Sequence, residues 1–296
     1  LTLGEIRDLW RAEHATDILP NTLRSYDLSW AFLAPLARTK MRDMRTDQIQ
    51  CIIDDEVAKG HSRSQCEKIR TLYSQLCKYA MKKDIIDRNY ASFLRLPRCG
   101  HKQRLIFSTE DLSKLTACAV SNDTARLILI LIYTGMRINE LLLLPMSGVD
   151  LQHDILTGGE KTSAGRDRAI PILPEIRNYV KYFYDKSCGP LLIDGYDGNR
   201  TYANFRLRDF IPLLEQLGIR TQDRPFTPHC CRYTFATLAT SAGLEPEALK
   251  RILGHSQYQT TSDIYIQDDI DFLKTEMQKI AVTNKLLTTE EIEKNK

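Results

Sequence analysis

The stretch GVDLQHDILTGGEKTSAGRDRAIPIL, residues 148–173, alternates apolar and polar residues around glycine-rich turns. Alternation with a period of two residues is typical of β-strands, and turns of this composition join strands into hairpins. The segments on either side are helical instead: TARLILILIYTG (124–135) precedes the stretch and PEIRNYVKYFYDK (174–186) follows it. The predicted fold class is therefore mainly α with a small antiparallel β-sheet at one edge.

The first 95 residues or so show only the apolar spacing of helices. Helical segments are expected at residues 1–14, 21–37, 46–60 and 62–86, with Asn21 and Thr46 as N-caps of the second and third. Helices joined by such short loops pack as a bundle.

Pro97 and Gly100 interrupt the helical pattern within a basic segment, and Ser108 or Thr109 is expected to cap the next helix. We therefore predict a helical domain at 1–96, a linker at 97–104, a second domain at 105–284 and a tail at 285–296. A chain of 296 residues is long enough for two such domains.

The composition, 43% apolar and 27% charged, is ordinary for a soluble globular protein. No apolar run approaches the length that spans a bilayer, so we expect a cytoplasmic protein with no membrane partner. The cysteines never form a CxxC pair, which argues against disulfides, a zinc site or any other metal. They are Cys51, Cys66, Cys77, Cys99, Cys118, Cys188, Cys230 and Cys231.

The net charge of +3 is unevenly distributed. Residues 1–100 hold 17 basic against 13 acidic residues, and the remainder holds 24 against 25. The basic excess in residues 1–100 is mild support for contact with phosphate groups, although a solvated helical surface explains this excess equally well.

Two segments near the predicted sheet carry conspicuous basic residues. In YTGMRINEL (133–141), Arg137 begins a helix, where a cation opposes the macrodipole and needs an anion or a carboxylate such as Glu140. Lys161 lies at the tip of the predicted hairpin, where the simpler interpretation is a solvated lysine.

Two further segments lie near the C-terminus. Thr227 is expected to cap a helix with Pro228 in its first position, so that His229 and Arg232 share a face near the helix N-terminus, a favourable phosphate site. A helix from Pro246 is expected to end on Gly254, with His255 just past it. Tyr265 follows, in a helix capped by Thr260 or Thr261, where the alternative is a packed aromatic.

Taken together, these residues suit phosphoryl transfer by a tyrosine nucleophile. Two guanidinium groups can hold both non-bridging oxygens of a phosphodiester and stabilise the charge of the transition state. A cation can protonate the leaving oxygen and a histidine can accept the tyrosine proton.

The order of TGMRINEL, KTSAGRDRAIPI, TPHCCRYTFAT, LGHSQYQTT and a following tyrosine resembles the tyrosine recombinase (phage integrase) family. The resemblance covers the whole chain and implies a core-binding domain followed by a catalytic domain. It implies a site-specific DNA recombinase, acting without cofactor or metal, as the integrase of a mobile element. Tyr233 and Gln267 depart from the common pattern, at positions where many relatives have histidine.

The resemblance also implies a role for each residue. Arg137 and Arg232 would grip the phosphate, and Lys161 would protonate the departing 5′ hydroxyl, with Arg166 or Arg168 as rivals for that role. His229 would be the general acid/base and His255 a hydrogen-bonding histidine. Tyr265 would attack the phosphate to give a 3′-phosphotyrosine, with Tyr258 as the rival nucleophile.

The family resemblance further implies double-stranded DNA as substrate and a homo-tetramer formed by exchange of C-terminal tails, with a disordered tail as the alternative. An excisionase or a DNA-bending protein is a possible further partner. Because the chain begins at Leu1 rather than methionine, we expect a trimmed sequence from which an N-terminal arm-binding domain is missing. A chromosome-dimer resolvase, a type IB-like topoisomerase and a catalytically inactive DNA-binding regulator stay open as alternative functions.

Overall fold

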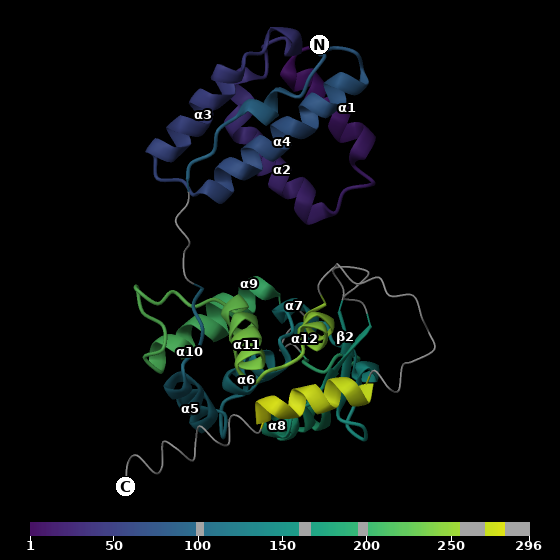
Figure 1. Cartoon of the computed structure of the whole chain (residues 1–296), viewed down its shortest axis with the longest axis vertical. Coiled ribbons are helices and arrows are strands. Elements are labelled where there is room, and N and C mark those ends of the chain that lie inside the picture. The colour runs from purple at the N-terminus through teal and green to yellow at the C-terminus, as the bar shows by residue number, and fades with distance from the viewer. Residues whose placement is uncertain (99–103, 160–166, 195–200, 255–269, 282–296) are drawn as a thin grey trace. The chain divides into compact units, whose positions relative to one another are not determined.

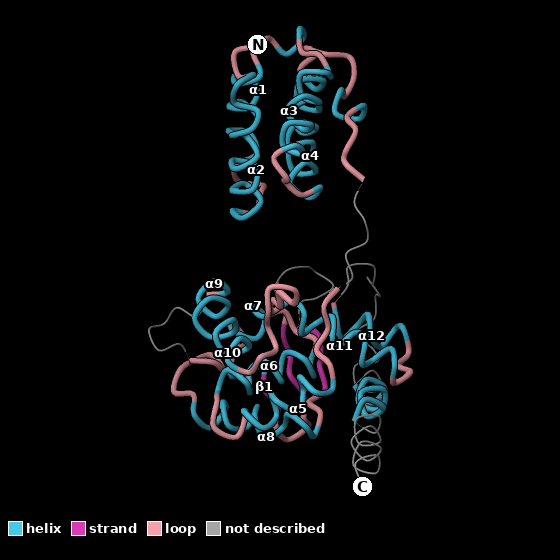
Figure 2. The backbone as a smooth tube through the Cα atoms, turned by 90° about the vertical axis from the view of Figure 1, so that its left-hand side faces the viewer, coloured by secondary structure: helices cyan, strands magenta, loops and turns pink. Residues whose placement is uncertain are grey.

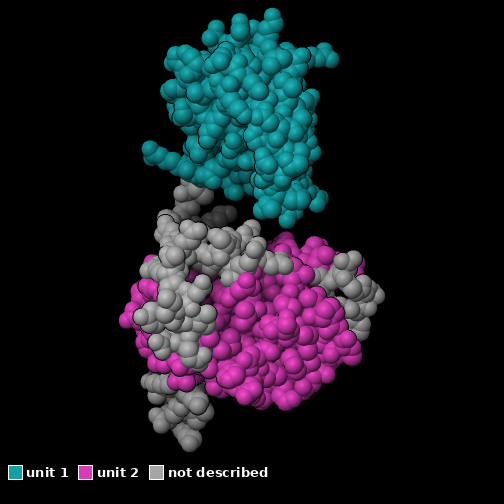
Figure 3. Space-filling model, turned by 90° about the vertical axis from the view of Figure 1, so that its right-hand side faces the viewer, with its two compact units in different colours: residues 1–102 teal, residues 103–296 magenta. Residues whose placement is uncertain are grey.

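The structure is a computed structural model that describes residues 1–98, 104–159, 167–194, 201–254 and 270–281. The chain divides into two compact units, Leu1–Lys102 and Gln103–Lys296, which Figure 3 colours separately. The division falls inside the segment 97–104. Within the described residues, no helix combines the length and the apolar character needed to cross a membrane.

The first unit is built of helices joined by loops where the structure describes it, with one isolated β-bridge between Thr2 and Lys40 (Figures 1 and 2). Its elements are α1 (Leu3–His14), α2 (Pro20–Leu33), η1 (Ala34–Leu36), η2 (Met41–Asp43), α3 (Thr46–Ala58), α4 (Arg63–Lys82) and η3 (Tyr90–Phe93). Helix α4 packs against α1, α2 and α3. Its buried face includes Ile69, Leu72 and Leu76, which recur at the spacing of one helical face. The predicted bundle is therefore present.

Two helix starts in the first unit differ from the sequence-based prediction. Helix α2 begins at Pro20 with Leu19 at the N-cap position, so Asn21 lies inside the first turn. Proline is favoured there because its ring fixes φ near the helical value and its missing N–H would have no partner anyway. Helix α3 begins at Thr46 itself, with Arg45 at the N-cap position and the Arg45 N–H donating to Oε1 of Gln48.

The second unit is helical with one small sheet. Its helices are α5 (Thr109–Cys118), α6 (Asp123–Thr134), α7 (Ile138–Leu142), η4 (Met146–Gly148), α8 (Pro174–Lys186), α9 (Tyr202–Asn204), the π-helix η6 (Phe205–Phe210), α10 (Ile211–Gln216), α11 (His229–Ser241) and α12 (Pro246–Leu253). A further helix spans residues 270–281 and is yellow in Figure 1. The strands are β1 (Val149–Asp150), β2 (Ile155–Gly158) and β3 (Arg168–Pro171).

Helix α6 lies at the centre of this unit and contacts α5, α8 and α11. Every residue from Leu127 to Thr134 is buried, as expected of a helix that is apolar on all sides. The sheet has the antiparallel order β1-β2-β3, in the stretch predicted to alternate. The predicted fold class, mainly α with a small antiparallel sheet, is confirmed (Figure 2).

Candidate active site

The turn between α6 and α7 begins on a glycine that no other residue could easily replace. Gly135 caps α6 in the left-handed conformation, with φ of 64°. A Cβ built there would lie 2.5 Å from the Cδ1 atom of Phe235 on α11. The absence of a side chain therefore lets α11 approach this turn closely, which brings Arg232 of α11 beside Arg137 of α7.

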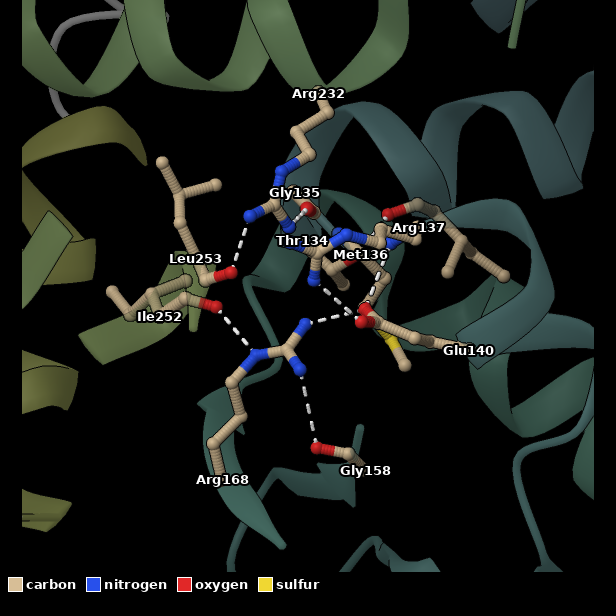
Figure 4. A network of polar contacts seen from close by, with 11 residues as sticks. Thr134, Gly135, Met136, Arg137, Glu140, Gly158, Arg168, Arg232, Ile252 and Leu253 are labelled. Atoms are coloured by element: carbon tan, nitrogen blue, oxygen red, sulfur yellow. Dashed lines mark hydrogen bonds and ion pairs between the residues drawn. The ribbon is translucent and has the colours of Figure 1, made fainter. Parts of the chain in front are cut away.

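Glu140 is the central acceptor of the site (Figure 4). Arg137 occupies the N-cap position of α7 and donates from Nη1 to Oε1 of Glu140 at 2.7 Å, while its backbone N–H donates to Oε2 at 2.9 Å. From β3, Arg168 donates from Nη2 to Oε2 of Glu140 at 2.6 Å. The predicted pairing of Arg137 with Glu140 is confirmed.

The carboxylate of Glu140 is buried, with 5% of the residue exposed. Burial by itself raises the pKa of this group, but the hydrogen bond and the charge of Arg168 and the contacts with Arg137 outweigh it. The pKa of Glu140 is lowered as a result. Glu140 is therefore ionised at neutral pH and fixes the orientation of two guanidinium groups.

Arg232 projects from α11 towards the same turn (Figure 4). It donates from Nη1 to the carbonyl oxygen of Gly135 at 2.8 Å and from Nη2 to the carbonyl oxygen of Leu253. The pKa of Arg232 is lowered to about 10, mainly by burial and then by the positive charge of Arg137, which together outweigh the opposing charge of Glu140. Arg232 stays protonated at neutral pH, and a bound anion would further stabilise its charge.

His229 lies one helical turn before Arg232 and is exposed to solvent. Its ring meets the ring of Tyr233 edge-on at 4.6 Å between centroids, and the guanidinium of Arg104 lies 4.5 Å from the Tyr233 centroid. Partial desolvation of the imidazole lowers the pKa of His229, and the charges of Arg232, Arg137 and Arg104 lower it further. His229 is therefore neutral at neutral pH and can accept a proton.

The structure brings together three of the six predicted site residues, namely Arg137, His229 and Arg232. The other three, Lys161, His255 and Tyr265, lie outside the described residues, as do Arg166 and Tyr258. Among the described residues, no group of three or more His, Cys, Asp or Glu side chains could hold a metal ion.

Two details of the sequence-based prediction need correction. Arg168 does not extend from a hairpin tip as a rival of Lys161, because its guanidinium is buried and bound to Glu140 and to the carbonyl oxygen of Ile252. Thr227 does not cap α11, which begins at His229 with Pro228 at the N-cap position. The role of Arg168 was missed because GRDR resembles an exposed turn, although alternation in RAIPI places Arg168 on the same face as Ile170.

The arrangement is suited to a tetrahedral oxyanion. Three guanidinium groups, those of Arg137, Arg168 and Arg232, surround a single described carboxylate, so positive charge is in excess. The Arg137 side chain is 29% exposed and accessible to a ligand, whereas Glu140 beneath it is buried. Two fixed guanidinium groups beside a neutral imidazole can bind a phosphate and move a proton near it.

Comparisons with known proteins agree with this chemistry. Residues 105–271 match the model of the phage integrase family. The chain is 32% identical over 169 residues to tyrosine recombinase XerA of Thermococcus kodakarensis, covering 55% of this chain and 57% of that protein. It is 30% identical over 205 residues to XerA of Pyrococcus furiosus, covering 67% and 69%. The chain thus spans between half and three quarters of the length of these relatives.

Solved structures show the same fold at low sequence identity. The Tn1549 transposon integrase in complex with transposon right end DNA has a TM-score of 0.76 at 18% identity, covering 95% of this chain and 100% of that chain. A lambda integrase tetramer bound to a Holliday junction has a TM-score of 0.72 at 18% identity, covering 90% and 81%.

Proposed function

Because the chain belongs to the phage integrase family of tyrosine recombinases, we propose that it is a site-specific DNA recombinase that cuts and rejoins DNA. It forms a 3′-phosphotyrosine intermediate and serves as the integrase of a mobile element. One observation carries this proposal: Arg137 and Arg232 converge beside a neutral His229 at a buried turn.

Each residue of the site has a step in the proposed reaction. Arg137 and Arg232 hold the non-bridging oxygens of the scissile phosphate and stabilise the charge that develops on them. The hydroxyl of Tyr265 attacks phosphorus as His229 accepts its proton, and the bond from phosphorus to the 5′ oxygen breaks. Lys161 protonates that oxygen and His255 donates a hydrogen bond to the phosphate. Attack by a 5′ hydroxyl on the phosphotyrosine reverses these steps and joins the strands.

We assign a different role in the reaction to each domain of the chain. Residues 1–96 are the core-binding domain and residues 105–284 the catalytic domain, joined by the linker at 97–104, and each domain contacts double-stranded DNA. Basic residues of both contact the DNA backbone. The tail at 285–296 docks onto a neighbouring protomer in a homo-tetramer. The protein acts on nucleoid DNA in the cytoplasm, with an excisionase or a DNA-bending protein as a further partner.

A trapping experiment tests this proposal. A pool of nicked duplexes with randomised sequence around the nick is incubated with the protein and EDTA, and protein-linked DNA is isolated on a denaturing gel. The nick lets the short 5′-hydroxyl strand diffuse away, which prevents religation. Wild-type protein is compared with Tyr265→Phe and, as a matched control from the same segment, Tyr258→Phe.

Each outcome has a definite meaning. An adduct formed by the wild type and Tyr258→Phe but not by Tyr265→Phe supports the proposal. An adduct retained in Tyr265→Phe and lost in Tyr258→Phe moves the nucleophile to Tyr258. No adduct with the wild-type protein contradicts the recombinase and favours a protein that only binds DNA.

The similarity to XerA favours a second candidate, a chromosome-dimer resolvase. The sequences recovered from the trapped DNA separate the two. A resolvase recombines two copies of one site, whereas an integrase also joins the end of an element to a different target. Recombination of the recovered site only with itself would favour the resolvase.

A further inference from the structure

The last turn of α12 is held by two buried arginines. Arg168 of β3 donates from Nε to the carbonyl oxygen of Ile252 at 2.7 Å, and Arg232 of α11 donates from Nη2 to the carbonyl oxygen of Leu253 (Figure 4). The last carbonyl groups of a helix have no partner within it and carry partial negative charge. A guanidinium group supplies these carbonyl groups with both a hydrogen-bond donor and a positive charge. The two arginines therefore fix the end of α12, whose C-cap is Gly254.

Arg168 is also attached at two other points. Its Nη2 donates to Oε2 of Glu140 at 2.6 Å, and its Nη1 lies 3.4 Å from the carbonyl oxygen of Gly158, the residue opposite it on β2. One planar side chain thus joins the sheet, α7 and α12. Each of these elements lies close in sequence to a residue of the proposed reaction: Arg137 is the N-cap of α7, Lys161 follows the last residue of β2 by three positions, and His255 follows the C-cap of α12.

Stability alone does not account for a buried ion pair of this kind. The side chains of Arg168 and Glu140 are 6% and 3% exposed, so both charges have lost most of their hydration. Apolar residues of similar volume usually stabilise a protein as well as such a pair does or better. What the pair supplies instead is fixed geometry, because the guanidinium fork accepts only one arrangement of its partners.

We propose that Arg168 is a positioning residue for DNA strand cleavage, holding Glu140 and the end of α12 so that Arg137 and Arg232 grip the phosphate together. This inference rests on the proposed recombinase function. Arg168 contacts the DNA at no step: it acts through Glu140 on Arg137, and through α12 on the backbone that Arg232 also binds. Its loss therefore slows cleavage without weakening DNA binding.

The test measures binding and cleavage separately. The trapped duplex from the experiment above is used with Arg168→Met, which keeps the length and apolar stem of the side chain, and with Arg168→Lys. The matched control is Arg177→Met, since Arg177 makes an ion pair with Asp154 and donates to the carbonyl oxygen of Leu151 in the same unit. The dissociation constant and the cleavage rate at saturating DNA are measured for each.

Arg168→Met is expected to cleave about 100-fold more slowly, as for a displacement of roughly 1 Å at a reacting centre, with its dissociation constant unchanged. Arg168→Lys retains a charge for Glu140 but lacks the fork and is expected to be slow as well. Guanidinium ion added below denaturing concentration is expected to restore part of the cleavage rate of a third variant, Arg168→Ala, measured in the same way. Arg177→Met is expected to cleave at the wild-type rate.

The outcomes separate this inference from the proposed function. Wild-type cleavage by a folded Arg168→Met protein, or equal losses of binding and rate, would overturn the positioning role and leave the recombinase intact. Should Arg168→Met fail to fold, a folded Arg168→Lys protein that cleaves at the wild-type rate would overturn it equally. A wild-type protein that forms no adduct removes the proposed function and this inference with it.

Discussion

Arg137 occupies a position that is electrostatically unfavourable for a cation, the start of a helix. Glu140, three residues later, compensates with a hydrogen bond of 2.7 Å, and this local pairing could be predicted from the sequence. Arg168 could not be predicted in the same way. Its acceptor Ile252 is 84 residues away, and no local pattern reveals which carbonyl group a distant guanidinium will meet.

The protonation of His229 depends on charges contributed by three segments. Arg232 lies on α11, Arg137 at the start of α7, and Arg104 near the start of the second unit, over the Tyr233 ring. Each favours the neutral imidazole, so the pKa of His229 is below its ordinary value. Replacing Arg104 by methionine removes one of these charges, and we expect the pKa of His229 to rise.

The measurement is an NMR titration of the His229 ring proton in the free protein, which does not depend on any activity. Arg126→Met is the control, since Arg126 also stacks on a tyrosine, Tyr182, at 4.1 Å. In the cleavage reaction, the loss of rate on acidification is expected to move to higher pH in Arg104→Met, because the neutral form of His229 is the proton acceptor. An unchanged titration in Arg104→Met would show that Arg104 has no influence on His229.

At the scale of elements, helix ends were predictable where a local hydrogen bond decides them. Ser108 caps α5 as predicted, with its N–H donating to Asp111 at 2.9 Å and its hydroxyl accepting from the Asp111 N–H. The prediction that Thr227 caps α11 was wrong, because Pro228 already has helical backbone angles and occupies the N-cap position. The Thr227 hydroxyl contacts Sγ of Cys230 at 3.6 Å instead of capping the backbone.

The end of α6 offers a direct test of how closely α11 must approach. Gly135→Ala is expected to destabilise the second unit by about 3 kcal/mol, from the left-handed backbone and the clash with Phe235 together. Gly218→Ala is the matched control, because Gly218 has a φ of +65° with nothing within 4 Å of its built Cβ. Gly218→Ala is expected to lower the free energy of unfolding by about 1 kcal/mol, which is the contribution of the left-handed backbone alone. Equal shifts of the urea midpoint would contradict the close approach.

A buried carboxylate on the helix over 270–281 accepts a hydrogen bond from the N-cap of α12. Glu276, 5% exposed, accepts from the Glu245 N–H at 2.8 Å, at the start of α12. Burial raises the pKa of Glu276, but the hydrogen bonds from Lys279 and the Glu245 N–H outweigh it, and the pKa is lowered from 4.5. The folded state therefore gains stability above the ordinary pKa and loses it as pH falls through the folded value.

Glu276→Gln is expected to lower the free energy of unfolding by about 1 kcal/mol at about pH 7, as for loss of a helix cap. The difference from the wild type should shrink as the solution is acidified below pH 4.5, where Glu276 is protonated first in the unfolded chain and then, at lower pH, in the folded chain as well. Urea unfolding of both proteins between about pH 7 and pH values below 4.5 measures this difference in the free energy of unfolding. Glu110→Gln, in an ion pair whose Glu110 side chain is 77% exposed, should change little. A difference independent of pH would rule out the charge of Glu276 as the cause.

At the scale of the whole molecule, the two units have separate apolar cores. One core contains Leu72 and Leu76 of α4, and the other contains Leu127 to Ile132 of α6. Periodicity predicted both because each helix shows its own buried face in its own sequence. It could not predict contacts across long stretches of chain, such as the ion pair of Arg224 with Asp111 over 113 residues, which depend on how the finished helices pack.

Separate cores predict that each unit unfolds on its own. Both tryptophans, Trp10 and Trp30, belong to the first unit, so tryptophan fluorescence reports its unfolding alone, while circular dichroism reports both units. Leu72→Ala, at a residue 1% exposed, is expected to destabilise the first unit by about 3 kcal/mol and to shift the fluorescence midpoint in urea. Gly135→Ala should leave that midpoint unchanged and shift only the dichroism of the second unit. A fragment of residues 1–102 should reproduce the fluorescence transition of the full chain. If instead Gly135→Ala shifted the fluorescence midpoint, the two cores would unfold as one.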